Sequence, residues 1–147
     1  MKPKSTNYIT FECLSRSANE AFARGAVACF AAQLDPTLEE LGDIKTAVSE
    51  AVTNAIVHAY PDTLGRIVRK ARVLGEDVLE ITVRDWGKGI ADVEQARQPL
   101  YTTGGEERSG MGFTIMGSFM DGLRVRSHLD KGTTVTMQKR IHVKARA

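Results

Sequence analysis

Glu50 and Asn54 stand four residues apart in a strongly periodic segment, and His58 follows at the same interval. Residues spaced by four form a row along an α-helix, so the three side chains share one line. The apolar residues of the segment recur at steps of three and four: Ile44, Val48, Ala51, Ala55 and Ala59. The polar row lies about a quarter-turn from this stripe, at the rim of the buried face. A carboxylate, an amide oxygen and an imidazole there suit Mg²⁺-assisted chemistry on a phosphate, although Glu-x-x-x-Asn alone is more often a plain polar flank.

A second candidate site is Asp85-Trp86-Gly87-Lys88-Gly89, which follows a run of β-forming residues. A carboxylate at a strand end accepts hydrogen bonds in a fixed direction, and Gly87 and Gly89 let backbone approach a flat ligand closely. Such an acceptor would bind the exocyclic amine of adenine and reject guanine, which has a carbonyl at that position. The same residues also suit an ordinary turn.

A third candidate site is Arg108-Ser109-Gly110-Met111-Gly112, which precedes a predicted helix. Free backbone N–H groups at a helix N-terminus bind phosphate, and Arg108 would add a charge-assisted contact. Upstream, Thr102-Thr103-Gly104-Gly105 has the composition of a lid whose hydroxyls bind phosphate oxygens, or of a plain solvated loop. The chain lacks the Gly-Lys-Ser/Thr of a Walker A loop and the His-Arg-Asp and Asp-Phe-Gly motifs of protein kinases.

The elements that must position these residues follow from hydrophobic periodicity, capping motifs and turn residues. Strands are predicted over Tyr8–Cys13, Arg66–Leu74, Val78–Asp85, Leu123–Ser127 and Thr133–Ile141. Helices are predicted from the capping box at Ser17 to about Leu34, from the capping box at Thr37 to Pro61, and over Met111–Met120. The segment from Trp86 to Gly110 has little periodicity, and a loop of that length in a compact domain is usually functional or disordered.

The resulting order, β-α-α-β-β-α-β-β, predicts an α+β fold: a two-layer sandwich with helices on one face of a mixed, mostly antiparallel sheet. The chain has 147 residues, which suits one domain over 1–147. The net charge of +2 gives no bulk case for nucleic-acid binding, and no apolar run could span a membrane. We therefore expect a cytoplasmic protein that contacts neither nucleic acid nor membrane. Cys13 and Cys29 are expected to be reduced and buried, and the scattered histidines argue against a zinc site.

The three candidate sites occur in a specific order. Together they resemble the ATP-binding fold shared by gyrase, chaperone and histidine-kinase ATPases, and Gly132-Thr133-Thr134 resembles the last motif of that fold. The resemblance implies that Asn54 holds Mg²⁺, that Asp85 binds adenine with support from Thr133, and that ATP and ADP are the ligands.

Longer runs, such as Ser49-Glu50-Ala51-Val52-Thr53-Asn54-Ala55-Ile56 and Glu107-Arg108-Ser109-Gly110-Met111-Gly112-Phe113, resemble the anti-sigma F factors of spore-forming bacteria over about residues 8 to 140. This resemblance implies a homodimeric serine kinase that binds a sporulation sigma factor of RNA polymerase and phosphorylates an anti-anti-sigma protein. It assigns the general base to Glu50, phosphate contacts to Arg108, Ser109, Gly110 and Gly112, and a partner contact to Arg24.

Three alternatives remain. A nucleotide-dependent binding switch would keep Asn54, Asp85 and the glycines but need no base. A general-stress anti-sigma kinase of the same family would carry the same motifs. A histidine-kinase catalytic domain is less favoured, because no helix with a phosphoacceptor histidine precedes residue 8.

Overall fold

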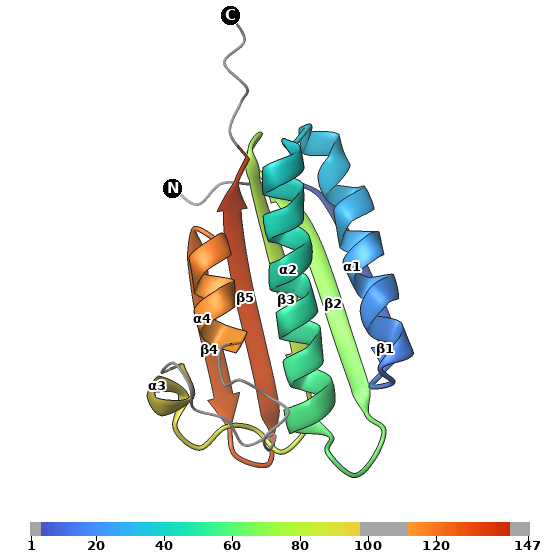
Figure 1. The fold of residues 1–147 in the computed structure, drawn as a ribbon, viewed down its shortest axis with the longest axis vertical. Coiled ribbons are helices and arrows are strands. Elements are labelled where there is room, and N and C mark those ends of the chain that lie inside the picture. Colours follow the sequence, from blue (N-terminus) through green and yellow to red (C-terminus); the bar gives the residue numbers. More distant parts are fainter. Residues whose placement is uncertain (1–3, 98–111, 142–147) are drawn as a thin grey trace, which may run out of the picture.

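A single five-stranded sheet with helices on one face forms the body of the protein. The computed structural model describes residues 4–97 and 112–141 (Figure 1). The strands are β1 (Ser5–Leu14), β2 (Arg66–Leu74), β3 (Val78–Asp85), β4 (Gly122–His128) and β5 (Gly132–Arg140). They lie in the order β1-β2-β3-β5-β4, and each of the four pairings is antiparallel. The predicted α+β sandwich is confirmed, and the sheet is antiparallel in all its described pairings, without the parallel pair that a mixed sheet would have.

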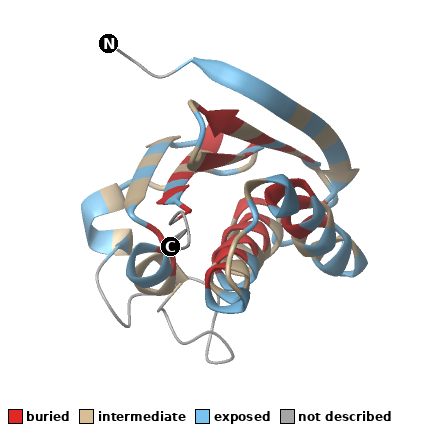
Figure 2. Ribbon diagram, turned by 90° about the horizontal axis from the view of Figure 1, so that it is seen from above, coloured by how far each residue is buried: buried red, intermediate tan, exposed pale blue. Residues whose placement is uncertain are grey.

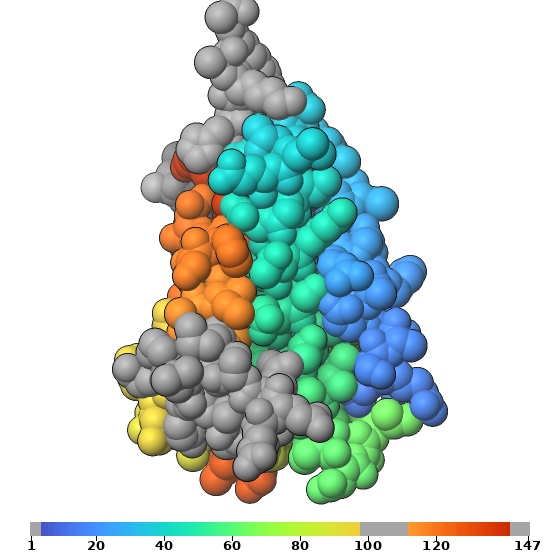
Figure 3. All heavy atoms as spheres, viewed as in Figure 1, coloured from blue at the N-terminus to red at the C-terminus, as the bar shows by residue number. Residues whose placement is uncertain are grey.

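The helices α1 (Ala18–Ala31), α2 (Leu38–Asn54) and α4 (Gly112–Phe119) lie side by side across that face. The short helix α3 (Val93–Ala96) lies apart from them, by the end of β4. A 3₁₀ turn at Ala32–Leu34 follows α1, and a π-helical turn at Ala55–Ala59 follows α2. Figure 3 shows α1 and α4 on opposite sides of α2. The short helix α3 lies in the segment predicted to have little regular structure, so that prediction was too coarse. Four residues are too few for a periodic signal.

The two predicted capping boxes have different outcomes. Glu40 N donates to the Thr37 hydroxyl over 3.0 Å, and Thr37 N donates to the Glu40 carboxylate over 2.9 Å. The box that begins α2 is therefore confirmed. The prediction at Ser17 is wrong, because its side chain caps no N–H. An N-cap residue needs extended backbone, whereas Ser17 is helical at φ −59° and ψ −30°.

The core fills the space between the sheet and the helices α1 and α2. Every member of the predicted apolar stripe of the second helix is buried: Ile44, Val48, Ala51, Ala55 and Ala59. Strands β2, β3 and β5 supply the opposite wall, and Figure 2 shows the buried residues concentrated between the two layers. The prediction that both cysteines are buried is wrong. Cys29 lies on the exposed side of α1, and Cys13 is partly exposed on the edge strand β1.

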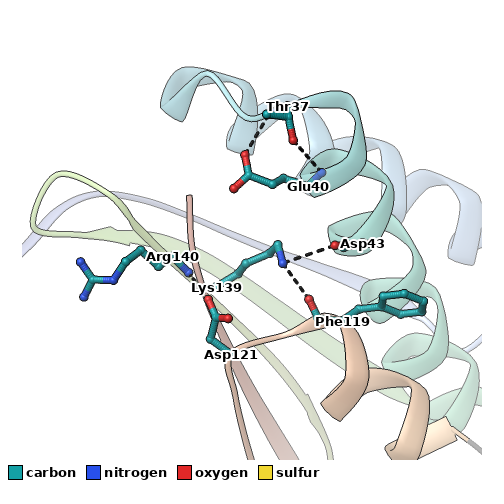
Figure 4. A network of polar contacts seen from close by, with 7 residues as sticks. All are labelled: Thr37, Glu40, Asp43, Phe119, Asp121, Lys139 and Arg140. Atoms are coloured by element: carbon teal, nitrogen blue, oxygen red, sulfur yellow. Dashed lines mark hydrogen bonds and ion pairs between the residues drawn. The ribbon is translucent and has the colours of Figure 1, made fainter. Parts of the chain in front are cut away.

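A buried lysine fastens the C-terminal end of α4 to the rest of the fold (Figure 4). Lys139 of β5 donates to the carbonyl oxygen of Phe119 over 2.9 Å, and its Nζ lies 3.4 Å from a carboxylate oxygen of Asp43 in α2. A cation at a helix C-terminus satisfies a carbonyl that has no partner within the helix. One side chain therefore joins β5, α2 and α4 at the end of the sheet away from Asp85.

Candidate functional site

A cavity of about 320 Å³ opens at one end of the sheet, beside the C-terminal end of α2. Its volume lies at the lower end of the range of small-molecule pockets. The helix side of the wall consists of Ala51, Asn54, Ala55, His58 and Ala59, and the sheet side consists of Val83, Asp85, Thr133 and Val135. The loop after β3 and the start of α4 complete it with residues that include Lys88, Gly89, Ile90, Gln95, Gly112 and Phe113. The wall is mainly apolar with few polar groups, which suits a flat aromatic ligand held by its edge.

Asp85 is the buried acid of this cavity, with 6% of its surface exposed. Its Oδ1 accepts hydrogen bonds from the backbone N–H groups of Gly87 at 3.0 Å and Thr133 at 3.2 Å. Neither bond uses Oδ2. Burial raises the pKa of Asp85, and the two N–H donors oppose that rise only in part. Asp85 is therefore a directional acceptor whose orientation is fixed through one oxygen, leaving the other for a ligand.

Two hydroxyl groups brace the strand that supports Asp85. Ser127 and Thr133 face each other across the β4–β5 hairpin, with their hydroxyl oxygens 2.7 Å apart. The Ser127 hydroxyl oxygen also accepts from Ile90 N at 2.7 Å, which ties the loop after β3 to the hairpin. Thr133 therefore contacts Asp85 through its backbone N–H, while its hydroxyl contacts Ser127. Sequence reasoning missed Ser127, although the register about the predicted turn at Asp130-Lys131-Gly132 pairs it with Thr133.

The glycines after Asp85 are required by the packing of the chain itself. A Cβ at Gly87 would overlap the carbonyl oxygen of Ala59, to which Lys88 N donates at 3.1 Å. Gly89 has φ +74°, and a Cβ there would overlap the carbonyl oxygen of His128. The backbone at Gly87 thus packs closely against the π-helical turn. Gly89, in contrast, also lines the cavity.

A tyrosine that sequence reasoning also missed fixes the start of this loop. The Tyr60 hydroxyl donates to Arg66 O and accepts from Trp86 N, each over 2.8 Å. Burial raises the pKa of Tyr60, so the hydroxyl stays protonated and able to donate. The contact of Tyr60 with Trp86 joins residues 26 positions apart, so no local sequence pattern predicts it.

Asn54 ends α2 at the point where the cavity meets α4. A Cβ added to Gly112 would lie 2.8 Å from Asn54 Nδ2, so glycine at this position lets α4 pack against the Asn54 side chain without displacing it. The π-helical turn begins directly after Asn54, and such turns are frequent at functional sites. His58 joins Asn54 in the cavity wall. Glu50 is half-buried one turn earlier and is not among the lining residues.

Arg24 lies on α1, away from the cavity. Its side chain is 43% exposed and forms an ion pair of 3.5 Å with Glu20 one turn before it. An exposed pair of this kind contributes little to stability, so Arg24 is available to a partner. The other predicted phosphate-site residues, Thr102, Thr103, Arg108, Ser109 and Gly110, lie outside the described residues.

The donor set near Asn54 limits how a metal could bind. Among residues 4–97 and 112–141, no group of three His, Cys, Asp or Glu side chains could hold a metal ion. A hard cation such as Mg²⁺ accepts one amide oxygen when phosphates and water supply its other ligands. Asn54 fits that arrangement.

Within residues 4–97 and 112–141, no helix is long and apolar enough to span a membrane.

Comparison with known proteins agrees with this geometry. Residues 14–139 match the family model described as a histidine kinase-like ATPase domain. The anti-sigma F factor of Thermoanaerobacter sp. (strain X514) is 58% identical over 92% of this chain and 95% of its own. Those of Clostridium perfringens (strain ATCC 13124) and Geobacillus kaustophilus (strain HTA426) are each 55% identical, over 92% of this chain and 98% and 93% of their own. The chain therefore belongs to the anti-sigma F factor family within the histidine kinase-like ATPase domains.

Solved structures show the same fold at lower identity. The RsbU and RsbW domains of a Mycobacterium tuberculosis protein align with a TM-score of 0.68 and 20% identity, over 92% of this chain and 32% of that one. A mycobacterial sensor histidine kinase, MprB, aligns with a TM-score of 0.56 and 20% identity, over 69% of this chain and 72% of its own.

Proposed function

We propose that this protein is an ATP-dependent anti-sigma factor and serine kinase. It would bind and inhibit a sporulation sigma factor in the cytoplasm and, with Mg-ATP, phosphorylate a serine of an anti-anti-sigma protein. Family membership supports the proposal, since the relatives are named anti-sigma F factors. The observation that carries it is the buried Asp85 carboxylate, held by two backbone N–H groups through one oxygen in a mainly apolar cavity.

The cavity would take the adenine base of ATP or ADP. The exocyclic amine of adenine would donate a hydrogen bond to Asp85 Oδ2. The apolar walls at Ala55, Val83 and Val135 would cover the faces of the ring. Guanine presents a carbonyl at the same position, so its oxygen would face the carboxylate without a proton between them. That repulsion selects adenine.

The phosphates would extend toward the start of α4. Asn54 would hold Mg²⁺ through its amide oxygen, and the backbone at Gly110 and Gly112, with Arg108 and Ser109, would bind the phosphate oxygens. Thr102 and Thr103 would bind the same phosphates through their hydroxyl groups. When bound, Mg²⁺ would supply positive charge that offsets the negative charge on the transferred phosphoryl group.

Glu50 would act on the substrate serine. Its position, one helical turn before Asn54 and outside the lined cavity, suits contact with a protein hydroxyl that arrives from solvent. The Glu50 carboxylate would accept the proton of the serine hydroxyl while the serine oxygen attacks the terminal phosphorus of ATP. ADP would then leave.

Arg24 would contact partners on the exposed side of α1. A domain of this size has limited surface for two unrelated interfaces of about 800 Å² per partner, which favours one surface for the sigma factor and the anti-anti-sigma protein. A homodimer would present two such surfaces.

The test is a phosphotransfer assay with purified candidate partners. The protein is incubated with Mg-ATP and a candidate anti-anti-sigma protein, and phosphoserine is located by mass spectrometry. Samples with EDTA and with Asp85→Asn serve as controls. ATP-dependent sigma-factor binding without phosphoserine would favour the binding switch. Preference for a general-stress partner pair would favour the other kinase of the family.

A further inference from the structure

The face of the sheet that points away from the helices is strongly basic. No helix among the described residues covers it, as Figure 2 shows. Alternate residues of β2, β3, β4 and β5 place cations on this outer face: Arg66, Lys70, Arg72, Arg84, Arg124, Arg126 and Arg140. The carboxylates that the strands place there are Glu12 and Glu80. The whole chain carries only +2, so positive charge is concentrated on the outer face and the remainder of the protein is net acidic.

Arg84, Arg124 and Arg126 are exposed and take part in none of the ion pairs found among the described residues. The acids on this side of the sheet pair with other cations: Glu12 with Arg66 at 3.4 Å, Glu80 with Arg72 at 2.6 Å, and Asp77 with Arg140 at 2.8 Å. The three arginines are therefore available to carboxylates of another molecule.

Arg84 is held in place by stacking on Trp86. Its guanidinium carbon lies 4.6 Å from the centroid of the Trp86 ring, and that of Arg66 lies 3.8 Å from the same centroid. Stacking uses the flat face of a guanidinium and leaves the N–H donors in its plane able to bind both oxygens of a carboxylate. A side chain that is already held loses less conformational entropy when it binds a ligand. Arg84 is therefore a preorganised receptor for a carboxylate.

Threonines of β5 form a low floor between the three arginines. Arg84 of β3 pairs with Thr134, and Thr134 pairs with Arg126 of β4, so about 10 Å, or two strand spacings, separates the two arginines. Arg124 pairs with Thr136 and lies two residues from Arg126, a separation of about 7 Å. The floor is hollowed at one end by a pocket of about 180 Å³, which is lined by Gly122, Leu123, Arg124, Thr136 and Gln138.

This geometry fits an extended acidic peptide. A chain that lies over β5 has Arg84 on one side and Arg124 and Arg126 on the other. Alternate residues of an extended chain point to the same side and are about 7 Å apart, which matches the separation of Arg124 and Arg126. The short threonine side chains leave room for the peptide backbone and offer hydroxyl groups to it.

Nucleic acid is the other anionic polymer that a basic face could bind. Sites for single strands combine cations with aromatic faces on which bases stack. Here the Trp86 ring is already stacked by guanidinium groups, and Lys70 Nζ lies 5.4 Å from the centroid of the Tyr8 ring. Glu12 and Glu80 would also face the phosphates. These features favour a peptide over a nucleic acid.

We propose that the outer face of the sheet binds a short, extended acidic segment of a partner protein between Arg84 on one side and Arg124 and Arg126 on the other. The segment carries aspartate or glutamate at alternate positions. None of the three arginines lines the cavity beside Asp85, so this site is separate from the nucleotide cavity. A few extended residues bury much less than the roughly 800 Å² of a globular interface, and the site therefore leaves the surface of α1 to other partners. The concentrated charge would also steer an acidic partner to this face.

The test measures binding of the full chain to a labelled peptide of eight residues with blocked ends, in which glutamate alternates with threonine. The control ligands are the same peptide with glutamine in place of glutamate, and a five-nucleotide oligothymidylate of the same net charge. Binding is followed by fluorescence anisotropy at low salt. We expect the glutamate peptide to bind at least about 10-fold more tightly than either control.

A matched pair of variants locates the site. Arg84→Gln with Arg126→Gln removes two cations beside the threonine floor and should weaken peptide binding at least about 10-fold. Arg16→Gln with Lys45→Gln removes the same charge from exposed positions outside the outer face and should weaken binding less than about twofold. Both double variants should keep the wild-type melting temperature.

A third variant guards against a local change at Trp86. Arg124→Gln with Arg126→Gln alters only β4, leaves the stack at Trp86 intact and should cause the same loss of peptide binding. Equal losses in the outer-face variants and in the matched control would show a bulk-charge effect and overturn the proposal. Equal binding of the glutamine peptide would also overturn it. Tighter binding of the oligothymidylate would identify nucleic acid as the ligand and overturn the assignment to a protein segment.

Discussion

Asp85→Asn changes one atom of the cavity and tests the adenine assignment. The amide oxygen of asparagine can keep the bonds from Gly87 N and Thr133 N. The other position then carries an NH₂ group in place of an oxygen. A donor would face the exocyclic amine of adenine, which is also a donor, so the ligand bond is lost while the loop keeps its support.

The expected loss of nucleotide-binding free energy arises because two buried hydrogen-bond donors face each other without an acceptor. Mismatched buried hydrogen-bonding groups cost roughly 2–4 kcal/mol, because each loses water without gaining a partner. At about 1.4 kcal/mol per tenfold, ADP and ATP should bind roughly 30- to 1,000-fold more weakly. Affinity for GDP should change much less, because the wild-type carboxylate does not match guanine.

The same change should alter the pH dependence of stability. Burial raises the pKa of folded Asp85 above its ordinary value near 3.8, so the folded state binds the proton more tightly than the unfolded state. The native carboxylate therefore becomes a growing cost to folding as pH rises from about 4 through the folded pKa. The asparagine side chain of the variant does not titrate. The melting temperature of Asp85→Asn minus that of the wild type should rise between pH 4 and pH 7.

Trp86 offers a direct assay, since it is the single tryptophan of the chain and adjoins Asp85. Its ring is stacked by the guanidinium groups of Arg66 at 3.8 Å and Arg84 at 4.6 Å and is 37% exposed. Titration of ADP and GDP can be followed by its fluorescence and checked by calorimetry. ADP affinity within about threefold of the wild type in a folded Asp85→Asn protein would refute the reasoning, as would equal wild-type affinity for ADP and GDP.

Three further substitutions test the other assignments, and a fourth tests the anchor of α4. Glu50→Ala should bind ADP normally but form phosphoserine on the order of 10²-fold more slowly, and an unchanged rate would leave Glu50 a polar flank. Asn54→Ala should weaken nucleotide binding in Mg²⁺ more than in EDTA, as measured by calorimetry; an equal effect would argue against the Mg²⁺ role. Arg24→Ala should weaken pull-down of at least one partner without changing ADP affinity or melting temperature, and intact binding of both partners would remove Arg24 from the interface. Lys139→Met should lower the free energy of unfolding in urea by about 1–3 kcal/mol, because the Phe119 carbonyl loses its donor, and an unchanged midpoint would contradict that.

Local patterns account for the elements that were predicted well. The apolar stripe of α2 and the turn between β2 and β3 involve residues close in sequence, so periodicity and turn chemistry define them. The capping box at Thr37 needed only an extended backbone at that residue, and Thr37 has one, at φ −68° and ψ 164°. Ser17 has the same side-chain chemistry but a helical backbone, set by its hydrogen-bonded turn with Glu20, and its motif was therefore misleading.

The site was predictable in its parts and not in its supports. Asp85 and Thr133 are separated by 48 positions, and only the family resemblance suggested that they meet. The bonds from Trp86 N to the Tyr60 hydroxyl and from Ile90 N to the Ser127 hydroxyl join residues 26 and 37 positions apart, and no local pattern reveals them. Glu50 illustrates the converse, because helical spacing placed it in line with Asn54 but could not show that Glu50 itself lies outside the cavity wall.

The contact of Lys139 with Phe119 gives α4 a fixed pivot. The helix has eight residues and is about 12 Å long, so a tilt of about 10° around that pivot would move Gly112 by about 2 Å. Gly112 borders Asn54, whose side chain an added methyl group would have to displace. The C-terminal end of α4 is thus anchored in the core, and its N-terminal end packs against the end of α2. Loss of the Lys139 contact would therefore change the position of Gly112 in the cavity wall, at the opposite end of the helix.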